Sequence, residues 1–208
     1  MKKLTIAALV TSSLLAANAS ASIVMVTDPG TSSKGNSAQI IAAPNAVTNS
    51  TVSNLGQQGF NEQQLVSLGS DLLVDGGSIV SGTNVASHMI FLNNPNGNNS
   101  LNSHENVVWE FSSNILGVMS DSGGTLEAAS SALLGATGTT YPSAFGARGF
   151  EGPDNYIIDG NKLTVSMYVT QPGDWIRVIT DVPEPASMAL FGLGLMGLGF
   201  SRRRKNQA

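Results

Sequence analysis

Short apolar runs alternate with turns rich in Gly, Asn and Ser along residues 22–181. Such runs between turn signals are typical of the strands of an all-β domain. The predicted strands are, in chain order, Ile23–Val26, Gln64–Gly69, Asp71–Val80 (divided by the turn Asp75–Gly77), Asn84–Leu92, Asn106–Phe111, Ile115–Ser120, Leu163–Val169 and Trp175–Ile179. We expect the last two of these to form a hairpin around the turn Pro172–Asp174. The pattern predicts a mainly β chain with a single β-sandwich or jelly-roll-like domain.

One segment, Thr125–Leu134, has helical rather than strand spacing. Leu126, Ala129 and Leu133 fall on one face of such a helix, which would be its apolar face. Thr125 stands at a possible N-cap position, and Gly135 stands where a helix commonly ends. The sequence therefore predicts one short helix.

The first 21 residues, Met1–Ala21, have the pattern of a secretory signal peptide. Two lysines follow Met1, an apolar stretch covers Leu4–Ala17, and two small-residue cleavage sites end at Ala19 and at Ala21. The alternative is an uncleaved membrane anchor, but the apolar stretch is short and no stop-transfer pattern follows it. We expect the Sec export machinery to carry the chain across the inner membrane, with cleavage after Ala21.

The last 27 residues, Val182–Ala208, combine three unusual features in a fixed order. Pro183 and Pro185 flank Glu184, and prolines hold the backbone extended, as a processing enzyme requires of its substrate. Fifteen apolar or small residues follow at Ala186–Phe200. As a helix they would span roughly 22 Å, less than the hydrocarbon core of about 30 Å. A basic cluster then follows within the tail 201–208, which would stop transfer at the cytoplasmic side.

This tail resembles the PEP-CTERM sorting signal, and the resemblance covers only Val182–Ala208. It implies recognition and processing by an exosortase, an integral membrane enzyme that cuts near the Pro-Glu-Pro motif. The implied recognition residues are Pro183, Glu184 and Pro185, with Ala186–Phe200 as a transient transmembrane helix. The implied stop-transfer residues are Arg202, Arg203, Arg204 and Lys205. The alternative is an ordinary tail anchor behind a Pro-rich linker.

The charge and the cysteine content of the chain argue against nucleic-acid binding, disulfides and thiol chemistry. Between Ser22 and Pro185 the chain has four basic and fourteen acidic residues, a net charge of −10. Scattered basic residues on an acidic domain give no footprint for a phosphate backbone, so we expect no nucleic-acid partner. The absence of cysteine excludes disulfides and thiol chemistry.

Two groups of residues are candidates for catalysis. The run Ser120–Gly124 resembles part of the nucleophile motif of chymotrypsin-like proteases, but no base or orienting carboxylate is evident. We favour a turn in which Asp121 or Ser122 caps the following helix. His88 and His104, the latter beside Glu105, match no compact metal spacing, and we favour surface or turn histidines.

The loop Gly135–Gly160 is where a ligand site would lie, since long loops often carry function. It contains Arg148 and several aromatic residues. Its acidic and amide side chains include Asp154, Asn155 and Asp159, oxygen ligands of the kind that calcium takes. We favour solvated turn acids over a calcium site and expect no cofactor, calcium being the one ion to consider.

The leading hypothesis is a non-enzymatic cell-surface or extracellular-matrix protein of biofilm-forming bacteria. It would be exported, briefly anchored in the inner membrane, processed by an exosortase and associated with exopolysaccharide. The alternative is a secreted hydrolase acting on polysaccharide or protein, which needs two carboxylates facing one cleft. Glu105, Glu110 and Asp121 are its candidates.

Overall fold

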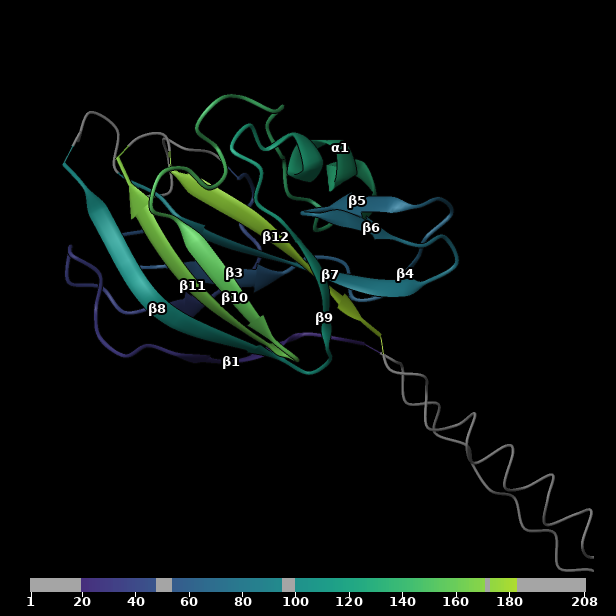
Figure 1. Cartoon of the computed structure of the whole chain (residues 1–208), viewed down its shortest axis with the longest axis horizontal. Coiled ribbons are helices and arrows are strands. Elements are labelled where there is room, and N and C mark those ends of the chain that lie inside the picture. The colour runs from purple at the N-terminus through teal and green to yellow at the C-terminus, as the bar shows by residue number, and fades with distance from the viewer. Residues whose placement is uncertain (1–19, 48–53, 95–99, 171–172, 183–208) are drawn as a thin grey trace, which may run out of the picture. The chain divides into compact units, whose positions relative to one another are not determined.

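The computed structural model describes residues 20–47, 54–94, 100–170 and 173–182, which are mainly β with one short helix (Figure 1). The elements are β1 (Ile23–Thr27), β2 (Gln39–Ile40), β3 (Gln58–Asn61), β4 (Val66–Ser67), β5 (Leu72–Val74), β6 (Gly77–Ile79), β7 (Asn84–Leu92), β8 (Asn102–Phe111), β9 (Ile115–Met119), α1 (Thr125–Leu134), β10 (Asn155–Asp159), β11 (Lys162–Val169) and β12 (Asp174–Asp181). Residues Ser20–Pro183 form one compact unit. The predicted apolar stretch Leu4–Ala17, the cleavage residue Ala19 and the sorting tail from Pro183 onward lie outside the described residues.

Two sheets enclose the main core, an arrangement consistent with a β-sandwich. A four-stranded sheet has the order β1-β8-β11-β10, and a six-stranded sheet has the order β2-β3-β7-β12-β9 with β4 also paired to β7. The largest buried side chain between the sheets is Trp109, whose indole N–H donates to Gln57 Oε1 at 3.0 Å. Gly59 lies under this ring, because a Cβ there would come within 2.6 Å of it. The other members of this core are Ile23, Ala38, Ile90, Leu92, Val107, Phe111, Val118, Leu163, Val165, Met167, Val169, Ile176 and Val178.

The predicted hairpin between Leu163–Val169 and Trp175–Ile179 is wrong. β11 pairs with β8 and β10 in the four-stranded sheet, whereas β12 pairs with β7 and β9 in the other. The apolar side chains of both strands face the same core from opposite sides. The chain therefore passes from one sheet to the other between β11 and β12, a crossing that an apolar pattern alone does not distinguish from a hairpin.

The six-stranded sheet is covered on its second face as well. Helix α1 lies beside β5 and β6 there (Figure 1), and Leu134 packs with Val74 and Met119. On the same face, near the start of β12 and the end of β7, Trp175 stacks on Phe91 with ring centroids 3.9 Å apart. Strands β7 and β12 are therefore buried on both faces, each except for one terminal residue.

Helix α1 has the predicted bounds but buries a different face. The Asp121 carboxylate accepts the backbone N–H groups of Thr125 and Leu126 at 2.7 and 3.0 Å. Asp121 therefore caps the helix, as predicted for the turn Ser120–Gly124. The residues that α1 buries are Glu127, Ser130 and Leu134, while Leu133 is 48% exposed. The prediction of a packed face at Leu126, Ala129 and Leu133 is wrong for Ala129 and Leu133, which are exposed, whereas Leu126 packs partly buried beside Leu134. Arg148 and Arg177 from other elements instead bond Glu127 and Ser130 on the buried face.

Both ends of the described domain meet at one turn between β8 and β9. Ser22 and Ser112 exchange two hydrogen bonds, and the Asn114 carbonyl accepts the backbone N–H of Asp181. We call Ser112–Asn114 the terminal clasp. Within residues 20–47, 54–94, 100–170 and 173–182, no helix is long and apolar enough to cross a membrane.

Candidate functional site

Two hollows lie at the end of the sandwich opposite the terminal clasp, which we call the distal end. Strand β12 begins there, with Asp174 opposite Leu92, and finishes at the clasp with Asp181 opposite Val85. Strand β8 also begins at the distal end, and β11 finishes there, with Val169 opposite Asn102. Residues near these strand ends and the loops joined to them line the two hollows.

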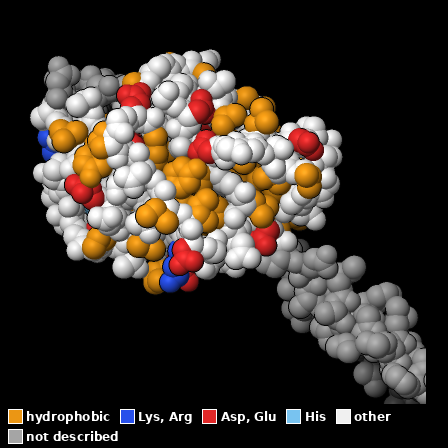
Figure 2. Space-filling model, viewed as in Figure 1, with side chains coloured by type: hydrophobic (Ala, Val, Ile, Leu, Met, Phe, Trp, Pro, Cys, Tyr) orange, Lys and Arg blue, Asp and Glu red, His pale blue; other side chains and the backbone are white. Residues whose placement is uncertain are grey.

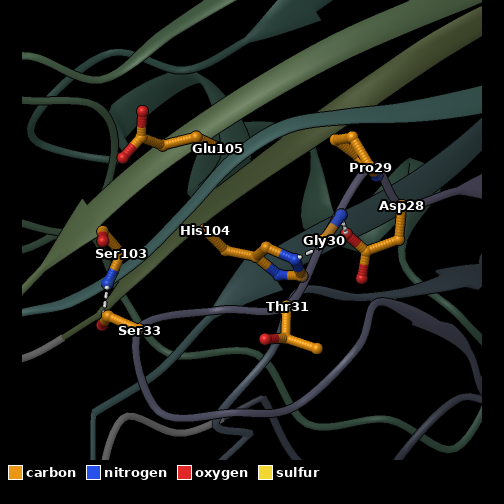
Figure 3. A pocket seen from close by; sticks show the side chains of 8 residues that line it. All are labelled: Asp28, Pro29, Gly30, Thr31, Ser33, Ser103, His104 and Glu105. Atoms are coloured by element: carbon orange, nitrogen blue, oxygen red, sulfur yellow. Dashed lines mark hydrogen bonds and ion pairs between the residues drawn. The ribbon is translucent and has the colours of Figure 1, made fainter.

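The larger hollow has a volume of about 350 Å³ and is shown in Figure 3. The segment after β1 and the start of β8 supply its lining residues: Asp28, Pro29, Gly30, Thr31, Ser33, Ser103, His104 and Glu105. The side chains of His104 and Asp28 point toward one another, and Glu105 points away from both. We call this the His104 hollow.

Both ring nitrogens of His104 are occupied. Nδ1 accepts the backbone N–H of Gln57 at 3.0 Å, and Nε2 donates to Asp28 Oδ1 at 3.0 Å. Asp28 also accepts backbone N–H groups from Gly30 and Ala38. Burial acts to raise the pKa of Asp28, but these bonds and His104 together lower it. The pair thus ties the segment after β1 to β8, and no ring nitrogen is left to accept a proton from a ligand.

His88 and His104 are both buried, so the prediction of surface or turn histidines is wrong. His104 is turned inward by a bulge at Asn106, where φ is 57° and one residue of β11, Ser166, lies opposite two of β8, Glu105 and Asn106. His88 is fully buried in β7 beside Phe111, with its ring nitrogens bonded to Asn61 and Thr180. Burial lowers the pKa of His88 to about 3.

The smaller hollow, of about 30 Å³, has an acidic lining. Its lining residues are Ala147, Glu151, Asp154, Tyr168, Val169, Thr170, Gly173 and Asp174. Burial, the charge of Asp154, a hydrogen bond with Asp154 and the charge of Glu151 raise the pKa of Asp174 to about 9. Burial also raises the pKa of Asp154, against the effect of its hydrogen bonds. We call this the carboxylate hollow.

The two hollows adjoin on the surface of neighbouring strands. Ser103 of β8 lies opposite Tyr168 of β11. The Tyr168 hydroxyl donates a hydrogen bond to Glu105, which is two residues after Ser103. This bond, followed by burial and nearby negative charge, raises the pKa of Tyr168. On the face shown in Figure 2, acidic side chains are scattered and basic ones are few. The distal end therefore presents carboxylates and hydroxyls.

A separate polar cluster lies buried between the six-stranded sheet and α1. Arg177 donates to both carboxylate oxygens of Glu62, and Arg148 donates to Glu127 at 2.6 Å. Burial acts to lower the pKa of Arg177, whereas Glu62 and Glu127 raise it. Arg148, which the sequence placed in a candidate ligand loop, is fully buried with its guanidinium over the rings of Phe145 and Trp175. These groups are buried, and both terminal nitrogens of Arg148 are without a hydrogen-bond partner among the described residues.

The structure separates the three residues proposed as calcium ligands. Asp154 lines the carboxylate hollow, and adjacent Asn155 donates to the Pro153 carbonyl. Asp159 lies at the other end of β10, opposite Lys162. The structure instead pairs Asp154 with Asp174, which sequence reasoning missed because Pro-Gly-Asp has the pattern of an ordinary turn.

The carboxylates suggested for a hydrolase do not share a groove. Glu105 and Glu110 lie on the same strand, separated by roughly 16 Å at the usual rise per residue. Glu110 lies 3.5 Å from Lys162, and Asp121 caps α1. Ser120, at the start of the protease-like motif, donates its hydroxyl to Asp75.

Comparison with known families gives one match, at the end of the chain. The model of the PEP-CTERM protein-sorting motif matches residues 181–205. This range contains the Pro183–Pro185 motif and the basic cluster Arg202–Lys205. The comparisons with curated proteins and with solved structures found no match.

Proposed function

We propose that the domain is a non-enzymatic surface or matrix protein that contacts extracellular polysaccharide through its distal end. The sorting motif indicates an exported, exosortase-processed protein of the cell envelope. The observation that most directly supports the proposal is the residue at which the match to this motif begins. Its match starts at residue 181, the last residue of β12, so the folded domain precedes the motif and is what the motif delivers.

The arrangement of the two chain ends supports contact through the distal end. Both ends of the domain leave from the terminal clasp, so a chain held through its tail presents the opposite end outward. That end carries the His104 hollow, whose serine, threonine and carboxylate groups match the hydroxyls of a neutral sugar chain. Of its lining residues, none is lysine or arginine, which disfavours an anionic sugar.

The hydrogen bonds that the polar side chains make within the fold support a binding role over a catalytic one. His104 uses both ring nitrogens within the fold, and the hydrolase candidates are divided between one strand and a helix cap. General acid–base catalysis requires a group that is free to exchange a proton with substrate. Such groups are not assembled among the described residues of the His104 hollow.

Binding of exopolysaccharide from the native host to the processed protein tests this proposal. The protein is recovered from the envelope and applied to immobilised polysaccharide, and retention is compared with that of Ser33→Asp. Ser33 lines the His104 hollow and is exposed, so the larger aspartate side chain would occupy part of the hollow and remove a hydroxyl that could bond a sugar. We expect at least a tenfold loss of affinity.

Lys162→Ala is the matched control, because this exposed residue lies at the clasp end, opposite Glu110. Its affinity should equal that of the wild type. Equal retention of wild type and Ser33→Asp would contradict contact through the His104 hollow. Release of reducing ends from the polysaccharide by the pure protein would contradict a non-enzymatic role.

A further inference from the structure

The carboxylate hollow contains a buried oxygen that has no hydrogen-bond partner. Asp174 is 6% exposed, and its Oδ2 atom is buried without a partner. Leaving a carboxyl oxygen in that state is costly, because burial removes its hydration and nothing replaces it. An oxygen of this kind beside two further carboxylates indicates a missing positive partner.

Asp154 is held in place on the other side of the same hollow. Its Oδ1 accepts the backbone N–H of Tyr168 at 2.6 Å, and its Oδ2 accepts that of Glu151 at 2.8 Å. Each carboxylate oxygen retains a further lone pair for another partner. Asp174 lines the same hollow, and the negative charges of Asp154 and Glu151 act on its carboxyl.

We propose that the carboxylate hollow is a calcium site, with Asp154 and Asp174 as its fixed ligands and Glu151 as its third carboxylate. On binding, Ca²⁺ would supply the partner that the buried Asp174 Oδ2 atom lacks. This proposal does not depend on polysaccharide binding and assigns residues different from the sequence-based set, of which only Asp154 is retained.

The size and lining of the hollow agree with this ion. A volume of about 30 Å³ suits one cation with little water, and no lining residue is basic. Among the described side chains no three acidic or histidine groups are already gathered as metal ligands. Glu151, which is exposed, would therefore move inward. Water and the oxygens of neighbouring Thr170 would complete the six to eight ligands that Ca²⁺ takes. Mg²⁺ demands a stricter octahedron and is disfavoured.

Calorimetric titration of the processed protein, purified from the envelope and freed of metal by chelation, tests the site. We expect one Ca²⁺ per chain with a Kd of about 0.1–1 mM, the range of extracellular calcium modules. At ten times the Kd, the Tm should rise by roughly 3–6 °C. Asp174→Asn should weaken binding at least tenfold. In chelator it should unfold at or above the wild-type Tm, because the amide removes the repulsion between two carboxyls that line one hollow.

Asp159→Asn is the matched control, since Asp159 lies at the far end of β10. It should bind Ca²⁺ as the wild type does. Glu151→Gln, which changes an exposed side chain, should weaken binding several-fold and serves if Asp174→Asn does not fold. The proposal is overturned if the wild type shows no saturable calcium binding, or if the variants at Asp174 and Glu151 bind with unchanged affinity.

Discussion

Arg177 and Glu62, which are 115 residues apart in the sequence, form a buried two-bond ion pair: Nε lies 2.7 Å from Oε2, and Nη2 lies 2.8 Å from Oε1. Both side chains are completely buried. Removing one partner of such a pair leaves an unpaired charge in the interior. We expect Arg177→Met to lower the free energy of unfolding by about 3–5 kcal/mol, measured by urea denaturation.

Lys162 and Glu110 provide the control for this variant. They form an ion pair at 3.5 Å, and the Lys162 side chain is 49% exposed. Lys162→Met should change the free energy of unfolding by no more than about 1 kcal/mol, because water screens exposed pairs. Similar small losses in both variants would show that the buried pair is not a major source of stability.

His88 makes stability depend on pH in a defined window. The ordinary pKa of histidine is 6.5, and burial lowers the pKa of His88 to about 3 in the folded chain. Between these values the unfolded chain binds a proton that the folded chain does not, so stability falls as the pH falls below 6.5. The contribution is about 1.4 kcal/mol per pH unit, or roughly 3 kcal/mol by pH 4.5.

The variant His88→Gln isolates this contribution, because glutamine does not titrate but still offers hydrogen bonds to Asn61 and Thr180. Its unfolding free energy, followed by denaturant titration from pH 7 to 4.5, should decline less steeply than that of the wild type. Parallel declines would mean that other groups dominate the acid response.

The position of Ala21 in the fold bears on signal-peptide cleavage. Its side chain is completely buried, and the neighbouring Ser22 N–H donates to Ser112 Oγ. Cleavage after Ala21 would remove this packing and place a charged amine at the terminal clasp. We therefore predict cleavage after Ala19, so that the mature chain begins at Ser20.

Intact-mass measurement of the exported protein distinguishes the two sites. A mature chain that begins at Ser22 would refute the prediction and agree with the expectation from sequence alone. N-terminal sequencing of the same sample provides an independent reading.

The sorting motif predicts a processing defect when its residues are changed. Glu184→Ala, or deletion of Arg202–Lys205, should leave most of the protein as unprocessed precursor in the inner membrane. Fractionation and intact mass measure the outcome. Glu105→Ala changes an exposed glutamate of the domain and should leave processing normal. Normal release of the motif variants would exclude the proposed processing route.

The fold was predictable wherever a local pattern decides the structure. The helix Thr125–Leu134 follows from its spacing and from the turn that precedes it, and the long strands follow from their apolar runs. Strand partners were not predictable, because apolar side chains on β11 and β12 fit either a hairpin or two facing sheets. The buried face of α1 depends on Arg148 and Arg177, whose positions no local pattern specifies.

The candidate site was less predictable than the fold. The bulge at Asn106 turns His104 inward, and alternation along the strand gives no sign of it. Asp154 and Asp174 meet only because β10, β11 and the start of β12 converge at the distal end. The sorting tail, by contrast, was predictable from a short contiguous pattern, and its match confirms it.

The place of β12 in the six-stranded sheet has a mechanical consequence. This strand has eight residues, pairs with β7 on one side and β9 on the other, and leads at Asp181 into the sorting tail. A pull on the chain beyond Val182 acts along the strand axis, so the hydrogen bonds of both ladders share the load in shear instead of opening one after another. A domain held at its distal end and pulled through its tail would therefore load β12 along its whole length.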